Sequence, residues 1–334
     1  MTESPIFIVG SPRSGTTLMR QILDRHPALG ICSETHFIPL VYRRRRAFGD
    51  LSDPVKRKRA IDEYLQSRHI QRARFNIDEL TARLMRDATT YQAMFTSVLT
   101  YHAELHGKQR IGEKTPQHGL FLNILREWFP KSVIIHMVRD PRACVASMLQ
   151  MPWARGSVIS NARRWRKINE AARQFRGQPG YLEVRYEVLV TDPVAELHKI
   201  CSFVNEEYSP ALLVPDPNPN EAAGEKHSRS VKAVTPGRLE LWRQQLTTAQ
   251  IAQIDWTLGP SLERFGYSRE APPASAFTVL RGISYFAYDW VRYMAARVPA
   301  VWYATGAKTN IAKFEYWSGP PAWRKTRMWW QEKT

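Results

Sequence analysis

The sequence predicts an α/β protein built on a parallel sheet, and three observations carry this prediction. Residues 6–9 (IFIV) form a short, fully apolar run that ends at Gly10, as a strand buried on both faces does. Further strand-like runs are found at 29–32, 110–112, 132–138 and 181–186. Segments with helical periodicity separate these runs, and such alternation is typical of parallel βαβ units with right-handed crossovers.

The remaining segments predict one main domain and an extension. Residues 40–105 are rich in Arg and Lys and show helical periodicity, which predicts a helical insertion in a main domain that spans residues 1–270. Residues 239–267 form the last helical segment of that domain. The extension, residues 271–334, holds six of the eleven tryptophans and nine Lys or Arg against three acidic residues. It opens with apolar residues at helical spacing, and we expect that helix to end at Pro299.

Composition narrows the class of partner. The chain of 334 residues has a formal net charge of +17, which attracts anionic partners such as nucleic acid, an anionic membrane surface or a polyanionic small molecule. No nucleic-acid recognition motif is present, so we expect no nucleic-acid partner. The three cysteines fit neither a disulfide framework nor a zinc site, which favours a reducing compartment. We expect no signal peptide and no transmembrane helix, and therefore a cytoplasmic protein.

The segment Gly10–Thr17 (GSPRSGTT) follows the first predicted strand and opens the first predicted helix. It matches the phosphate-binding pattern Gly-x4-Gly-Lys-[Ser/Thr] except that Thr16 replaces the lysine. That lysine neutralises the phosphates of a nucleoside triphosphate, so ATP hydrolysis is disfavoured. Backbone N–H groups and the N-terminus of the helix still form an anion site, and Arg13 adds a forked positive charge. We therefore expect a P-loop-like three-layer domain.

The segment "PRSGTTLMRQILDRHPALGICSETHFIP" resembles the opening of sulfotransferases that use 3′-phosphoadenosine-5′-phosphosulfate (PAPS), especially tyrosylprotein sulfotransferases and their bacterial relatives. The resemblance covers roughly residues 5–267. It implies that the loop holds the 5′-phosphosulfate end of PAPS, through Arg13, Ser14, Gly15, Thr16 and Thr17. A sulfuryl group carries less charge than a phosphoryl group, so the resemblance also implies that no metal is needed.

Further motifs extend this resemblance to the rest of the cofactor. In "VRDPRACVASM" it implies that Arg139 and Ser147 bind the 3′-phosphate, and an arginine at the carboxyl end of a strand agrees with the usual place of α/β ligand sites. In "VRYEVLVTDP" it places Tyr186 near the cofactor, although Tyr186 as an ordinary core aromatic stays equally open. A late loop, "SRSVKAVT", would contribute Lys232 as an anion contact.

For the catalytic residues, the resemblance implies Glu34 as general base and Lys114, in "GEKTP", as the cation that stabilises the leaving oxygen. His36 could be the base instead, because two residues apart on an extended segment both side chains face one side. A role for Glu34 as a mere helix cap and a solvated surface position for Lys114 also stay open. Glu113 receives no chemical role.

The sequence thus predicts a PAPS-dependent sulfotransferase that acts on a hydroxyl, or an amine, of a lipid, carbohydrate or small metabolite. It leaves open a tyrosylprotein sulfotransferase, a nucleotide-dependent phosphotransferase and a non-catalytic membrane-surface binding protein. Aromatic residues interleaved with Arg and Lys in 271–334 indicate either a helix at an anionic membrane surface or a helix packed on the domain or in a homodimer.

Overall fold

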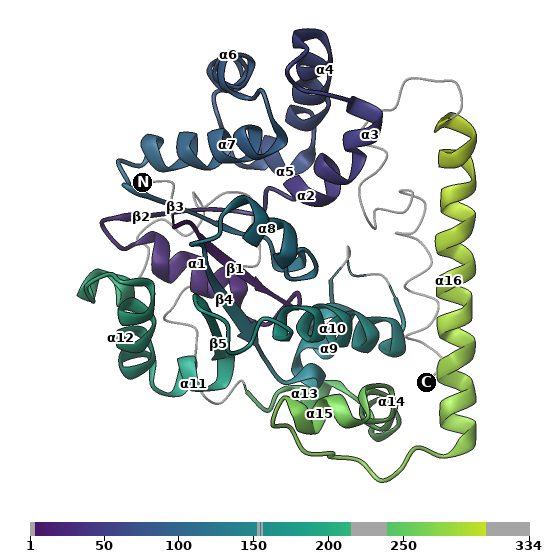
Figure 1. Ribbon diagram of the computed structural model, residues 1–334. Helices are drawn as coiled ribbons and strands as arrows, with labels where there is room; N and C mark the ends of the chain where they lie inside the picture. The colour runs from purple at the N-terminus through teal and green to yellow at the C-terminus, as the bar shows by residue number, and fades with distance from the viewer. Residues whose placement is uncertain (1–3, 152–153, 155, 215–238, 305–334) are drawn as a thin grey trace.

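The computed structural model describes residues 4–151, 154, 156–214 and 239–304, with the backbone alone for 292–304. Its centre is a sheet of five parallel strands in the order β2-β3-β1-β4-β5 (Figure 1). The strands are β1 (Ile6–Gly10), β2 (Leu29–Cys32), β3 (Arg110–Lys114), β4 (Val133–Val138) and β5 (Tyr181–Arg185). All five strands that the sequence predicts are present, and Tyr186 begins the following helix.

Helices separate the strands. Between β2 and β3 lie α2 (Phe37–Leu40), the 3-10 turn η1 (Tyr42–Arg44), α3 (Arg45–Phe48), α4 (Pro54–Leu65), α5 (Arg68–Arg72), α6 (Ile77–Asp87) and α7 (Tyr91–Leu105). The others are α1 (Thr16–Asp24), η2 (Pro116–Leu120), α8 (Leu122–Trp128), α9 (Pro141–Leu149), α10 (Val158–Arg173), α11 (Tyr186–Thr191), α12 (Pro193–Val204), η3 (Pro210–Leu213), α13 (Trp242–Gln245), α14 (Thr248–Leu258), α15 (Pro260–Arg264) and α16 (Ala276–Ala304).

The alternation of side chains along β1 builds the two faces of the sheet. Ile6 and Ile8 pack with the apolar residues of α1 and α12, whereas Phe7 and Val9 point to the opposite face and join the cluster of α7 and α8. Every residue of β1 is buried, as in a parallel strand covered on both faces. The architecture is the expected three-layer α/β domain with a central parallel sheet.

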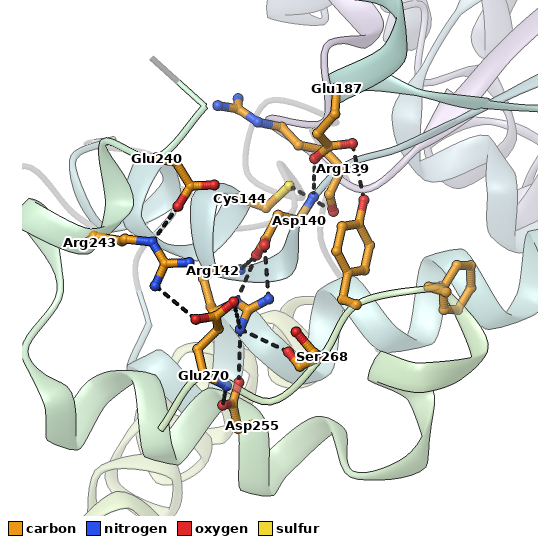
Figure 2. Close-up of polar contacts among 12 residues, drawn as sticks. Arg139, Asp140, Arg142, Cys144, Glu187, Glu240, Arg243, Asp255, Ser268 and Glu270 are labelled. Atoms are coloured by element: carbon orange, nitrogen blue, oxygen red, sulfur yellow. Dashed lines mark hydrogen bonds and ion pairs between the residues drawn. The ribbon is translucent and has the colours of Figure 1, made fainter. Parts of the chain in front are cut away.

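The buried side chain of Arg142 links the turn after β4 to the C-terminal helices (Figure 2). Both Arg142 Nε and Nη2 donate to the carboxylate of Asp140, at 2.9 Å each, and Arg142 Nη1 donates to the carbonyl of Ser268 at 3.0 Å. The carboxylates of Asp255 and Glu270 lie 3.8 and 3.9 Å from Nη1. Arg142 is almost fully buried and is the shared partner of three carboxylates from separate segments, and Arg243 adds a second positive charge at Glu270.

The extension begins with α16, which runs along one side of the molecule beside α10 and α14 (Figure 1). The expectation that this helix ends at Pro299 is wrong, because the helix continues to Ala304. A proline removes one backbone donor from a helix and does not by itself end one of this length. Among the helices of the described ranges, none combines the length and the apolar character that a membrane span requires.

Removal of the buried cation should destabilise the fold. We expect Arg142→Ala to lower the free energy of unfolding by about 3 kcal/mol, because three carboxylates lose their common partner. Arg243 provides a matched control, since it contacts the same Trp242 ring but its side chain is 46% exposed. Arg243→Ala should cost less than about 1 kcal/mol. Equal losses in urea unfolding would contradict this account of the buried arginine.

Candidate active site

The loop after β1 is shaped to hold an anion. Its backbone is left-handed at Arg13 (φ 71°) and Gly15 (φ 91°), a conformation that turns successive N–H groups toward one side. Gly15 is required there for a second reason, since a Cβ atom would come within 2.4 Å of the Tyr186 ring. No side chain of the described residues caps the N-terminus of α1, so the N–H groups of its first turn are left for a ligand.

The second motif meets this loop. Arg13 Nε donates to Ser147 Oγ at 2.8 Å, and Arg139 Nη1 donates to the carbonyl of Arg13 at 3.1 Å. The Arg139 guanidinium lies 4.3 Å from the centre of the Tyr186 ring. Arg139 Nε is buried and has no hydrogen-bond partner in the described part of the chain. An anionic ligand would satisfy this donor. The loop, Arg139, Ser147 and Tyr186 therefore lie together, and Tyr186 also packs against the core.

A buried lysine joins this site to the carboxylate at the end of β2. The Lys114 side chain is fully buried, and its Nζ lies 2.8 Å from Glu34 Oε1 and 3.2 Å from Thr17 Oγ1. The interpretation of Lys114 as a solvated surface lysine is therefore wrong. Burial alone would raise the pKa of Glu34, but the charge of Lys114 and a hydrogen bond to His36 outweigh it and hold this pKa well below the usual range. Glu34 is therefore ionised at neutral pH.

Two histidines lie beside Glu34. His36 Nε2 is 3.0 Å from Glu34 Oε2, so both candidate bases are in the site, and neither the position nor the contacts of Glu34 make it a helix cap. The ring of His69, from α5 of the insertion, is tilted by 36° relative to that of His36, and the two ring centres lie 3.8 Å apart. Burial lowers the pKa of His69 to about 2, so its ring is neutral. Ligand atoms of these three residues lie within 4.8 Å of one another, close enough to hold a metal ion, but the ammonium of Lys114 opposes a cation there.

Glu113, which received no role from sequence reasoning, orients the segment that carries Glu34 and His36. Its Oε1 accepts hydrogen bonds from Thr35 N and Oγ1, at 3.2 and 2.7 Å, and from the hydroxyl of Thr115. Its Oε2 lies 3.0 Å from His118 Nδ1. Burial opposes ionisation, yet His118 and these hydrogen bonds lower the pKa of Glu113. The sequence did contain a signal for this role, because Glu113 is an acidic residue next to Lys114 on a strand that a parallel sheet buries on both faces.

Lys232 and His69 mark the limits of prediction from the sequence. Lys232 lies outside the described residues, so its place relative to the site stays a prediction. No sequence signal pointed to His69, because its position depends on how the insertion folds back over the sheet. The three cysteines are free and buried.

Fold and site together define an α/β protein with an anion-binding loop and a lysine–carboxylate pair beside it. The sequence profile of the sulfotransferase family matches residues 5–210, and the chain belongs to this family. It is accordingly a sulfotransferase enzyme. Protein-tyrosine sulfotransferase 2 of Gallus gallus is 30% identical over 286 residues, which are 80% of this chain and 70% of the relative.

Solved structures agree on the fold. The sulfotransferase domain of the olefin synthase from Synechococcus PCC 7002 has a TM-score of 0.53 and 24% identity, and the match covers 80% of this chain and 96% of that one. The sulfotransferase domain from the curacin biosynthetic pathway has a TM-score of 0.54 and 20% identity, with 80% and 99% covered.

The Glu113 network predicts a specific stability change. Glu113→Gln should lower the free energy of unfolding at neutral pH by about 3 kcal/mol, because an amide NH₂ would replace one of the two carboxylate oxygens that face buried donors. The pKa of Glu113 is lowered in the folded state, so its contribution is complete above the unfolded value of about 4.3 and is lost as the pH falls through the folded pKa. Urea unfolding at neutral and acidic pH measures both effects.

Glu104 is the matched control for this experiment, since its carboxylate pairs with Arg83 at an exposed surface. Glu104→Gln should change stability by less than about 1 kcal/mol. A Glu113→Gln loss that did not exceed the control, or that grew in acid, would contradict the role given to Glu113.

Proposed function

We propose that this sulfotransferase transfers the sulfuryl group of PAPS to an acceptor hydroxyl, with Glu34 as general base and Lys114 as the stabilising cation. The observation that carries the proposal is the position of Lys114 Nζ, between Glu34 Oε1 and Thr17 Oγ1. One fully buried ammonium thus lies between the candidate base and the loop that would hold the donor. Its charge would stabilise the negative charge that develops on a leaving group bound by this loop.

The donor side fits an anion with two separate phosphate positions. The loop and the first turn of α1 offer backbone N–H groups for the 5′-phosphosulfate end. Arg139, whose Nε has no partner in the described residues, and Ser147 would bind the 3′-phosphate. When bound, PAPS supplies an activated sulfuryl group. These residues therefore suit PAPS better than a nucleoside triphosphate, for which the loop lacks its lysine.

On the acceptor side, Glu34 Oε1 contacts Lys114 and Oε2 contacts His36, and we assign the acceptor proton to Oε2. Transfer forms one sulfur–oxygen bond to the acceptor, breaks one to the 5′-phosphate and moves the proton to Glu34. A carboxylate with a lowered pKa is a weak base, so the proton moves late, after sulfur has been attacked. His36 and the neutral His69 border this oxygen and would orient the acceptor.

Lipids, carbohydrates and small metabolites are the proposed acceptor classes. A tyrosine hydroxyl is the second candidate, and the name of the Gallus gallus relative supports it. The reaction is proposed to need no metal ion, because Lys114 supplies positive charge beside Glu34. A nucleotide-dependent phosphotransferase would instead require magnesium.

Transfer of radiolabelled sulfate from PAPS into a cell extract tests the proposal. Glu34→Gln should lower the rate by about 10²- to 10⁴-fold, because the acceptor proton loses its base. Its affinity for the product 3′-phosphoadenosine-5′-phosphate should be unchanged, since Glu34 lies on the acceptor side. Addition of EDTA should leave the wild-type rate unchanged.

His36→Gln serves as the control, because it changes the neighbour of the same oxygen and keeps the carboxylate. It should lower the rate by less than about tenfold. A larger loss in His36→Gln than in Glu34→Gln would make His36 the base. Binding of the product without any transfer would favour a non-catalytic binding protein.

A further inference from the structure

The first turns of α16 present two chemically different faces. One face is fixed against the domain: a Cβ atom on Gly282 would come within 2.5 Å of Ile159 Cδ1, so the helix backbone lies directly on α10. Asp289 Oδ2 accepts hydrogen bonds from Ser157 N at 2.6 Å and from Ser160 Oγ at 2.7 Å, and thereby contacts the start of α10. These contacts set the rotation of α16 about its own axis.

The same rotation turns the apolar stripe of the helix away from the domain. Six large apolar residues form this outer face, and each is at least 43% exposed: Phe277, Leu280, Ile283, Tyr288, Trp290 and Val291. Figure 1 shows α16 at the side of the molecule, with the described chain on one side of it only. The helix packs on α10 and α14, which was one of the arrangements that the sequence left open, but it does so with its other face and leaves this stripe largely exposed. A contiguous exposed apolar face of this kind marks a binding surface.

Charge and residue type indicate which kind of partner binds this outer face. Asp289 is the sole acidic residue from Ala276 to Val291, and its carboxylate is turned inward, whereas Arg281 is exposed. The following residues, 305–334, carry six Lys or Arg against two acidic residues in the sequence. A second copy of a chain with a net charge of +17 would bring like charges together at this face. An anionic lipid surface is complementary to it.

We propose that the outer face of α16 binds the surface of an anionic membrane, with the helix parallel to the bilayer. Tyr288 and Trp290 have the amphipathic rings that are favoured at the headgroup level, and the apolar side chains would enter the boundary of the acyl region. The helix lies on the bilayer and does not span it, in agreement with the absence of a spanning helix in the described ranges. The proposal does not rest on the proposed chemistry and is tested without transfer.

Flotation of the full chain with vesicles tests this surface. The wild type should bind vesicles of phosphatidylcholine and phosphatidylglycerol in equal parts more tightly than phosphatidylcholine alone, and high salt should weaken that binding. Leu280→Glu/Val291→Glu should lower the affinity for the anionic vesicles by at least about tenfold, because two apolar side chains are replaced by anions on the docking face.

Val55→Glu/Val194→Glu is the matched control, because it makes the same charge change at exposed apolar residues of α4 and α12. It should retain at least about half of the wild-type binding. Equal losses in both variants would overturn the proposal. So would wild-type protein that ignores vesicles and sediments as a dimer that Leu280→Glu/Val291→Glu dissociates. Vesicle binding that is independent of lipid charge would contradict the choice of an anionic surface.

Discussion

The site depends on one buried charge. Lys114 has no exposed surface, and a buried ammonium is stable only with a partner of opposite charge, which Glu34 provides at 2.8 Å. The pair joins the end of β3 to the segment after β2, and its contact with Thr17 reaches the first turn of α1. Three segments that come from three strands are thereby held at one edge of the sheet. The position of every other group in the site follows from this edge.

This arrangement provides positive charge beside a phosphate-type loop that lacks its lysine. Thr16 occupies the lysine position of the loop, and the positive charge comes instead from the neighbouring strand, through Lys114, and from Arg13 within the loop. This cation lies beside the carboxylate of Glu34, so the proposed mechanism would couple charge stabilisation and proton transfer in one pair. In the proposed mechanism, an ammonium that turns toward the leaving oxygen would withdraw part of its charge from Glu34 and would make that carboxylate a stronger base when the proton has to move.

Patterns within short stretches of the sequence were sufficient to predict much of this structure. Short apolar strands, the loop glycines and the two arginine motifs are encoded within a few neighbouring residues, so β1 to β5 could be predicted and Arg13, Arg139 and Ser147 could be singled out as site candidates. His69 could not, because its place beside His36 depends on the packing of the whole insertion. The outer face of α16 is a similar case: periodicity identified the apolar stripe, but only the contact of Gly282 with α10 decides which side it faces.

The most direct test of the central claim is the pKa of Glu34, measured by carboxylate ¹³C NMR in the wild type and in Lys114→Met. The account predicts a wild-type pKa well below that of an ordinary glutamate, because Lys114 and His36 stabilise the carboxylate. In Lys114→Met the cation is gone and burial remains, so the pKa should rise. An ordinary wild-type pKa, or one that the substitution leaves unchanged, would show that Lys114 does not control the charge of Glu34.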